Sequence, residues 1–174
     1  MFTCEHYGVV PDMVVIGKGL GGGIFPFAAL IAREELNLAA DKALGHYTHE
    51  KSPVACAAAL ATLEVIREEN LLEKAERVGQ FALEKLRDLQ RRHSLVGDVR
   101  GLGLLLGVEL VRDSQSLERA TEEAEEVMYQ ALARGLSFKL TMGNIITLTP
   151  ALTVTEEEVT EAVGILDECL DLVG

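Results

Sequence analysis

Three β-branched residues, Val14 to Ile16, are followed by Gly17 and Lys18, and four of the next five residues are glycine. The apolar run predicts a short buried strand. A strand that stops at a lysine places the amine at the carboxyl end of a sheet, where α/β proteins bind ligands. The glycines allow a sharp turn and leave the amine uncrowded, which suits a lysine that forms a Schiff base with a carbonyl group. The competing interpretation is a solvated lysine, or one that binds phosphate through its charge.

Two nucleotide-binding motifs can be compared with the same glycines. Gly17, Gly19 and Gly22 have the G-x-G-x-x-G spacing of the dinucleotide fingerprint, but that motif needs a helix that opens at the glycines. Residues 24–32 predict another strand, so the context argues against this fingerprint. No segment that ends at Lys18 fits the P-loop pattern.

Charge and cysteine content narrow the class of protein. The formal net charge of −12 disfavours nucleic acid and anionic membranes as partners and is compatible with a cytoplasmic protein. Cys4, Cys56 and Cys169 form no C-x-x-C pair, so neither a zinc site nor a disulfide framework is indicated. No apolar run is long enough to cross a bilayer, and the first residues lack the regions of a signal peptide.

Periodicity and capping signals predict helices and strands in alternation. Pro53 after Ser52 marks a helix start, and Thr155 to Glu158 form a capping box. The second half of the chain predicts an α+β layer of about three strands. The expected helices are 53–69, 71–93, 116–134 and 155–172, and the expected strands are 14–16, 27–32, 99–110, 136–140 and 144–148.

The chain is predicted to divide near residue 68. Residues 1–67 form a strand–lysine–strand piece that ends in a linking helix, and residues 68–174 form a small α+β domain. Two strands and a glycine loop cannot bury their own apolar faces. We therefore interpret 1–67 as the C-terminal piece of a larger domain whose main sheet lies outside this chain.

Four segments, taken in order, resemble the class III pyridoxal-phosphate (PLP) aminotransferases. They are Gly17-Lys18-Gly19, Thr48 ahead of Pro53, Val99-Arg100-Gly101-x-Gly103, and Pro150-x-Leu152. The resemblance covers the whole chain. It implies the α/β fold of PLP-dependent transferases of fold type I: a fragment of the large domain is followed by a small α+β C-terminal domain. It also implies a homodimer with the active site at the interface.

The resemblance assigns roles to two residues. Lys18 matches the family lysine that forms the Schiff base with the cofactor and then moves a proton on the substrate. Thr48 matches the threonine that binds the cofactor phosphate from the neighbouring subunit. Without the resemblance, Thr48 is read as a turn threonine.

The sequence departs from the family pattern at one position that bears on the substrate. Many members of the family carry an arginine three residues before the Pro-x-Leu motif, where it pairs with the substrate carboxylate, and this chain has Thr147 there. Threonine cannot replace a bidentate guanidinium fork. Either the substrate differs or another cation serves, such as Lys139 or Arg100. The alternative interpretation makes Arg100 a structural partner near its glycines and Lys139 a solvent-exposed side chain.

The sequence therefore predicts a PLP-dependent aminotransferase that moves an amino group between an amine or amino acid and a 2-oxo acid. The family's ring-stacking aromatic and its aspartate at the pyridine nitrogen lie before the matched region, so the 174-residue chain alone is expected to be inactive. Two alternatives stay open. One is an amino-acid racemase or epimerase of the same family, and the other is a non-catalytic α+β remnant or interaction module.

Overall fold

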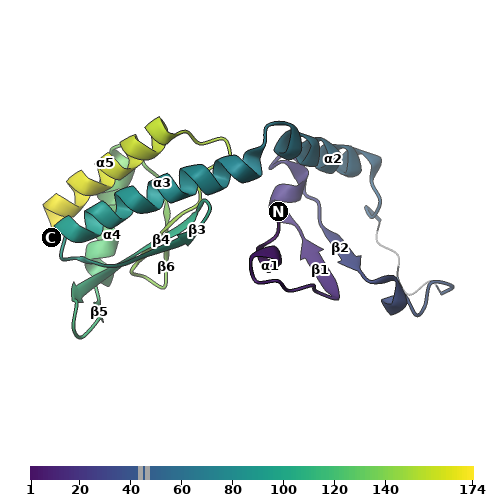
Figure 1. The fold of residues 1–174 in the computed structure, drawn as a ribbon, viewed down its shortest axis with the longest axis horizontal. Coiled ribbons are helices and arrows are strands. Elements are labelled where there is room, and N and C mark those ends of the chain that lie inside the picture. Colours follow the sequence, from purple (N-terminus) through teal and green to yellow (C-terminus); the bar gives the residue numbers. More distant parts are fainter. Residues whose placement is uncertain (43–44, 46–47) are drawn as a thin grey trace. The chain divides into compact units, whose positions relative to one another are not determined.

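The computed structural model describes residues 1–42, 45 and 48–174, and these form two compact units, Met1–Asn70 and Leu71–Gly174. The elements can be followed in Figure 1. Unit 1 contains α1 (Thr3–His6), β1 (Met13–Ile16), the 3₁₀ helix η1 (Lys18–Gly21), β2 (Ala29–Ala32), the 3₁₀ helix η2 (Glu34–Leu36) and α2 (Pro53–Glu68). Unit 2 contains α3 (Leu71–Arg92), β3 (Val96–Leu102), β4 (Leu105–Asp113), β5 (Glu118–Arg119), α4 (Thr121–Ala133), β6 (Lys139–Thr141), β7 (Ile145–Leu148) and α5 (Glu156–Val173).

Unit 1 is built on an antiparallel pair of strands joined by the glycine loop. β1 and β2 pair from Met13 with Ala32 to Ile16 with Ala29. The prediction that both strands are buried is wrong for this unit: the side chain of Val15 is 79% exposed and that of Leu30 is 63% exposed. The reason is that a two-stranded sheet offers each apolar face few partners.

Helix α2 packs against η1 through its small residues. Ser52 is the N-cap residue and Pro53 the first helical residue, as predicted, although the Ser52 side chain makes no capping hydrogen bond. Ala55 and Ala59 are the buried residues of this helix. A Cβ atom built on Gly22 would lie 2.9 Å from Thr62 Oγ1, so this glycine allows the loop to approach the helix closely.

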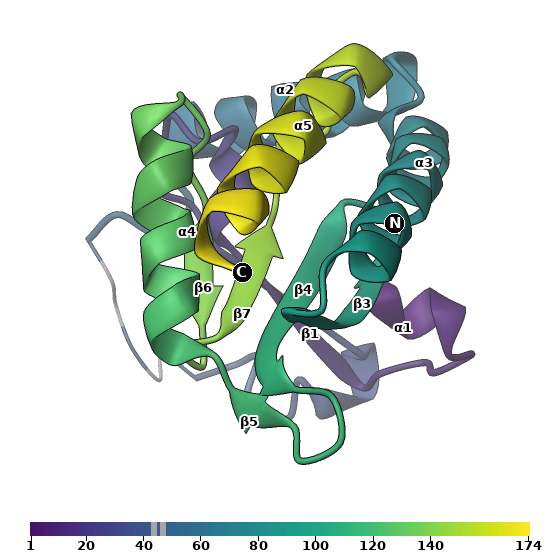
Figure 2. The ribbon, with the colours of Figure 1, turned by 90° about the vertical axis from the view of Figure 1, so that its left-hand side faces the viewer.

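Unit 2 is an antiparallel sheet covered on one face by α3, α4 and α5 (Figure 2). The strand order is β3-β4-β7-β6, and β5 pairs with β4 outside this path. The expectation of about three strands is therefore wrong, because five are present. Side chains from the helices and from alternate sheet positions share one core, whose fully buried members include Leu86, Leu110, Val127, Ile146 and Leu166.

The expected strand 99–110 is in fact a hairpin. β3 and β4 meet at the pair Leu102–Leu105, and Gly103 turns with a φ of +54°. The turn touches helix α3, because a Cβ atom on Gly79 would lie 2.2 Å from the Gly103 carbonyl oxygen. A continuous apolar run in the sequence conceals a two-residue turn of this kind.

The expected helix 116–134 begins five residues later than predicted, at Thr121. The Asp113 side chain accepts hydrogen bonds from the backbone N–H groups of Gln115 and Ser116, which holds this segment in a turn. The chain then returns as β5 before the helix starts. The capping box of the last helix is confirmed: the Glu158 N–H donates to Thr155 Oγ1, and the Thr155 N–H donates to Glu158 Oε2.

Candidate active site

Lys18 lies directly after β1 and Gly17, as the first residue of η1. Its side chain is exposed, and its φ of +53° lies in the left-handed region that residues with a Cβ atom rarely occupy. Backbone strain of this kind concentrates at functional sites. The strand ends at Ile16, as predicted, and Gly17 separates it from Lys18.

The loop after Lys18 depends on glycine. Gly22 and Gly23 have φ values of +68° and +74°, a conformation that only glycine adopts without cost. Gly21 is buried and packs close to Phe27, whose Cβ atom would lie 3.6 Å from an added Cβ atom. The chain therefore turns tightly directly after the lysine.

Thr48 belongs to unit 1 and lies in the exposed turn that leads to α2. A hydroxyl ahead of a helix start can donate to a phosphate oxygen. Its neighbours His46 and Tyr47 lie outside the residues that the structure describes. The assignment of Thr48 to a phosphate stays a prediction.

Thr147 belongs to unit 2 and lies in β7, half-buried. Its hydroxyl oxygen is 2.7 Å from Thr141 Oγ1 on the neighbouring strand β6. Sequence reasoning did not select Thr141. Its position two residues after Lys139 in an alternating strand was the signal that could have found it.

Arg100 and Lys139, the two cations that could serve in place of an arginine at position 147, differ in their partners. Arg100 Nη1 donates to Asp98 and, at 2.8 Å, to Glu109, and these bonds raise the pKa of its guanidinium above the ordinary value. This confirms Arg100 as a structural partner. Lys139 is exposed, as predicted, and has no ion pair within the part of the chain that the structure describes.

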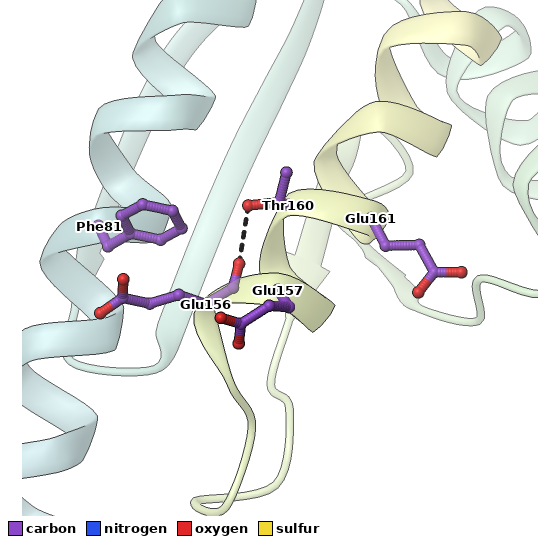
Figure 3. Close-up of a pocket in the computed structure, with 5 residues that line it drawn as sticks. All are labelled: Phe81, Glu156, Glu157, Thr160 and Glu161. Carbon is purple, nitrogen blue, oxygen red and sulfur yellow. Dashed lines mark hydrogen bonds between the residues drawn. The ribbon is translucent and has the colours of Figure 1, made fainter.

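A hollow of about 480 Å³ lies between α3 and the start of α5 (Figure 3). Glu156, Glu157 and Glu161 line it beside Phe81, and the Thr160 hydroxyl donates to the Glu156 carbonyl oxygen. Carboxylates repel the phosphate and carboxylate groups of a PLP enzyme's ligands. This hollow is therefore unsuited to the cofactor. Across the described residues, no group of three or more His, Cys, Asp or Glu side chains could hold a metal ion.

Residues 1–170 match the class-III aminotransferase family model. The chain is 48% identical to the (R)-1-hydroxy-2-aminoethylphosphonate ammonia-lyase of Vibrio splendidus, over 97% of this chain and 35% of that protein. It is 39% identical to the leucine/methionine racemase of Thermococcus litoralis, over 97% of this chain and 38% of the racemase. It is also 39% identical to the acetylornithine aminotransferase of Caldanaerobacter subterraneus, over 98% of this chain and 40% of that enzyme.

Solved structures of transaminases also match this chain. A transaminase from a marine Virgibacillus superposes with a TM-score of 0.93 at 28% identity, over 99% of this chain and 42% of that structure. An amine transaminase from an uncultivated Pseudomonas species, in its PLP-bound form, superposes with a TM-score of 0.90 at 30% identity, over 98% of this chain and 40% of that structure. The chain therefore belongs to the class III aminotransferase family, with the fold of PLP-dependent transferases of fold type I. It spans 35–40% of the length of these curated relatives.

Proposed function

We propose that the protein acts as a PLP-dependent aminotransferase that transfers an amino group between an amine or amino acid and a 2-oxo acid. The observation that carries this proposal is the geometry of Lys18. Its exposed amine follows a strand, its backbone is in the left-handed region, and glycines surround it. A primary amine in this setting can bond an aldehyde and later exchange a proton.

The side chains present fit the cofactor. Lys18 supplies the amine for the cofactor aldehyde, and the Thr48 hydroxyl supplies a donor for its phosphate. When bound, PLP supplies an electron sink for the bonds of the substrate carbon. The Lys18 amine would accept a proton from the substrate carbon and would then give that proton up again, so that it acts first as a base and then as an acid.

The assembly and location follow from the same proposal. A phosphate donor from the neighbouring subunit requires a homodimer with its active sites at the interface. The charge of −12 supports a protein that works away from nucleic acid and anionic membranes, in the cytoplasm. Within the described residues, no helix has both the length and the apolar character that a membrane crossing requires.

A second candidate is a lyase or racemase reaction on the same lysine. It is favoured by Thr147 in place of the carboxylate-binding arginine, and by the ammonia-lyase and racemase among the relatives. These reactions need the same amine, so the lysine geometry fits each of them.

The test uses the full-length enzyme with PLP and a panel of amines and amino acids. A transaminase consumes 2-oxoglutarate or pyruvate in step with the donor. A lyase releases ammonia without an oxo acid, and a racemase inverts its substrate without one. Turnover that depends on the oxo acid supports the proposal, and turnover that is independent of it overturns the transaminase assignment. A preparation that shows no cofactor absorbance would favour the non-catalytic module.

A further inference from the structure

The left-handed backbone of Lys18 needs support from other parts of unit 1. A residue with a Cβ atom keeps such a conformation only where the surrounding structure fixes it. The Lys18 side chain is exposed, so its own packing cannot supply that support. The support has to come from the chain on either side, where β1 ends at Ile16 and η1 and the glycines follow.

The glycine loop, defined here as residues 18–25, is held together by its own backbone. The Gly22 N–H donates to the Gly19 carbonyl oxygen at 3.0 Å, and the Phe25 N–H donates to the Gly21 carbonyl oxygen at 3.2 Å. These bonds make the loop compact, but they join only residues within it. The pairing of β1 with β2 fixes the two ends of the connection, so a contact with another element has to fix its middle.

Helix α2 supplies that contact through one of its faces. Ala55, Ala59 and Thr62 are four and three residues apart, a spacing that places side chains on the same side of a helix. α2 packs against η1, and the small side chains of Ala55 and Ala59 are buried. Thr62 continues this face and reaches the loop, because a Cβ atom on Gly22 would lie 2.9 Å from Thr62 Oγ1.

Thr62 is held in place where it meets the loop. Its hydroxyl donates to the Ala58 carbonyl oxygen one helical turn earlier, at 2.8 Å, and this bond is part-buried. A β-branched side chain has few χ1 conformations in a helix, and the bond selects one of them. The oxygen beside Gly22 is therefore a fixed stop for the loop and not a mobile group.

We propose that Thr62 is a positioning residue for Lys18. Through Gly22 it fixes the middle of the glycine loop, and the loop in turn holds the Lys18 amine in its reactive orientation. Thr62 needs no contact with the cofactor or the substrate. The role rests on the proposed function, in which the Lys18 amine is the reacting group. Since a misplacement of about 1 Å can cost about 100-fold in rate, a small shift of the loop is enough to slow the reaction.

The kinetic test compares Thr62→Ala with Thr62→Ser in the full-length PLP enzyme. Alanine removes the oxygen that meets Gly22, so kcat should fall about 10- to 100-fold while KM changes little. Serine keeps that oxygen and should restore most of kcat. Alanine is also the better helix former, so a fall in kcat cannot be assigned to a weaker α2. A rise in KM at an unchanged kcat would indicate a substrate contact and would overturn the role.

The second readout needs no turnover. PLP added to the cofactor-free enzyme should attach to Lys18 about 10-fold more slowly in Thr62→Ala than in the wild type or Thr62→Ser. Borohydride trapping at successive times, followed by peptide mapping, measures this rate. Thr160→Ala is the matched control, because the Thr160 hydroxyl makes the same kind of bond in α5, to the Glu156 carbonyl oxygen at 2.7 Å. An equal fall in Thr160→Ala, or no fall in Thr62→Ala, overturns the proposal.

A double variant tests whether Thr62 acts through Gly22. Gly22→Ala places a Cβ atom against Thr62 Oγ1 and strains a backbone whose φ is +68°. Because Thr62→Ala removes that oxygen, Gly22→Ala should slow the attachment of PLP by a smaller factor in the Thr62→Ala background than in the wild type. Equal factors in the two backgrounds would show that the two residues act independently, which is contrary to the proposal.

Hydrogen exchange separates this inference from the proposed function. If the full-length protein turns over no amine or binds no PLP, the proposed function fails, and the backbone amides of residues 19–25 still report on the loop. They should exchange faster in Thr62→Ala than in the wild type or Thr62→Ser, and Thr160→Ala should leave them unchanged. Unchanged exchange of these amides in Thr62→Ala would overturn the inference.

Discussion

His93 Nε2 lies 2.6 Å from Asp167 Oδ1, which ties the residue after α3 to the middle of α5. Arg92 Nη1 donates to both oxygens of the same carboxylate at 2.6 and 2.7 Å. Burial by itself would raise the pKa of Asp167, but the hydrogen bonds from Arg92 and His93 outweigh it and lower that pKa below its ordinary value. The Asp167 carboxylate on α5 therefore binds both Arg92 and His93 at the C-terminal end of α3.

The first prediction is that Asp167→Asn destabilises the protein by about 1–3 kcal/mol at pH 7. The substitution removes the charge of a part-buried carboxylate and so weakens its hydrogen bonds to two partners. The folded pKa of Asp167 is lowered, so its contribution is fully present above the unfolded value of about 3.9 and is lost as pH falls through the folded value. The stability gap between wild type and variant should therefore close below about pH 4.

Denaturant unfolding at pH 7 and pH 3 measures this gap. Asp171→Asn is the control, because Asp171 is 76% exposed and lies 3.7 Å from His93 Nδ1. It should change the free energy of unfolding by no more than about 0.5 kcal/mol. Equal effects of the two variants, or a gap that is independent of pH, would contradict the role of Asp167.

Local signals in the sequence predicted the features that depend on neighbours along the chain. The capping box of Thr155 and Glu158 is such a feature, since both partners lie within one helical turn. Lys18 after its strand is another. The hairpin at Gly103 was missed because a continuous apolar run gives no sign of a turn until the pairing of Leu102 with Leu105 is known.

Contacts between distant segments could not be read from the sequence. The pairing of Gly107 with Thr147, and of Thr147 with Lys139, depends on the order β3-β4-β7-β6, which is set by packing of the whole sheet. Thr141 and Thr147 are six residues apart, but their hydrogen bond depends on the register of β6 and β7. The register also decides which face each side chain occupies.

The second prediction concerns the close approach of α3 to the β3–β4 turn. Gly79→Ala should destabilise unit 2 by about 1–3 kcal/mol or more, because the new Cβ atom meets backbone that cannot move aside. That atom would lie 2.2 Å from the carbonyl oxygen of Gly103 and 2.8 Å from its Cα atom. Thermal unfolding of the variant measures the loss.

Gly164→Ala in α5 is the matched control, since a Cβ atom there meets nothing within 4 Å. Alanine is the better helix former, so this variant should gain about 0.5–1 kcal/mol. A neutral result for Gly79→Ala would show that the turn at Gly103 moves away from the helix without cost.

The third prediction is that Lys18→Ala in the full-length enzyme abolishes covalent attachment of the cofactor. Turnover should fall by about 10²–10⁴-fold or more, the contribution of a positioned acid–base group. Lys51→Ala is the control, because Lys51 is also an exposed lysine of unit 1 with a positive φ, +57°. Borohydride reduction followed by peptide mapping should label Lys18 in the wild type. A label on any other residue would disprove the assignment.

The fourth prediction is that Thr48→Ala weakens cofactor binding by about 1.5–3 kcal/mol, the size of one lost hydrogen bond to a charged group. Thr48→Ser keeps the hydroxyl and should bind nearly as well as the wild type. Equilibrium dialysis of PLP measures both variants, and sedimentation reports the oligomeric state. Unchanged affinity in Thr48→Ala, or a fully active monomer, would count against a phosphate contact that crosses subunits.

The fifth prediction is that the wild type handles 4-aminobutyrate and acetylornithine poorly and that Thr147→Arg improves both. A new guanidinium fork can pair with a carboxylate, and a charge-assisted contact of this kind contributes about 1.5–3 kcal/mol. Thr147→Gln is the control, because it adds length without charge and should leave carboxylate substrates poor. Steady-state kcat/KM over amines, ω-amino acids and both enantiomers of α-amino acids measures these changes. Efficient use of 4-aminobutyrate by the wild type would show that Lys139 or another cation already pairs with carboxylates, and the argument from Thr147 would then fail.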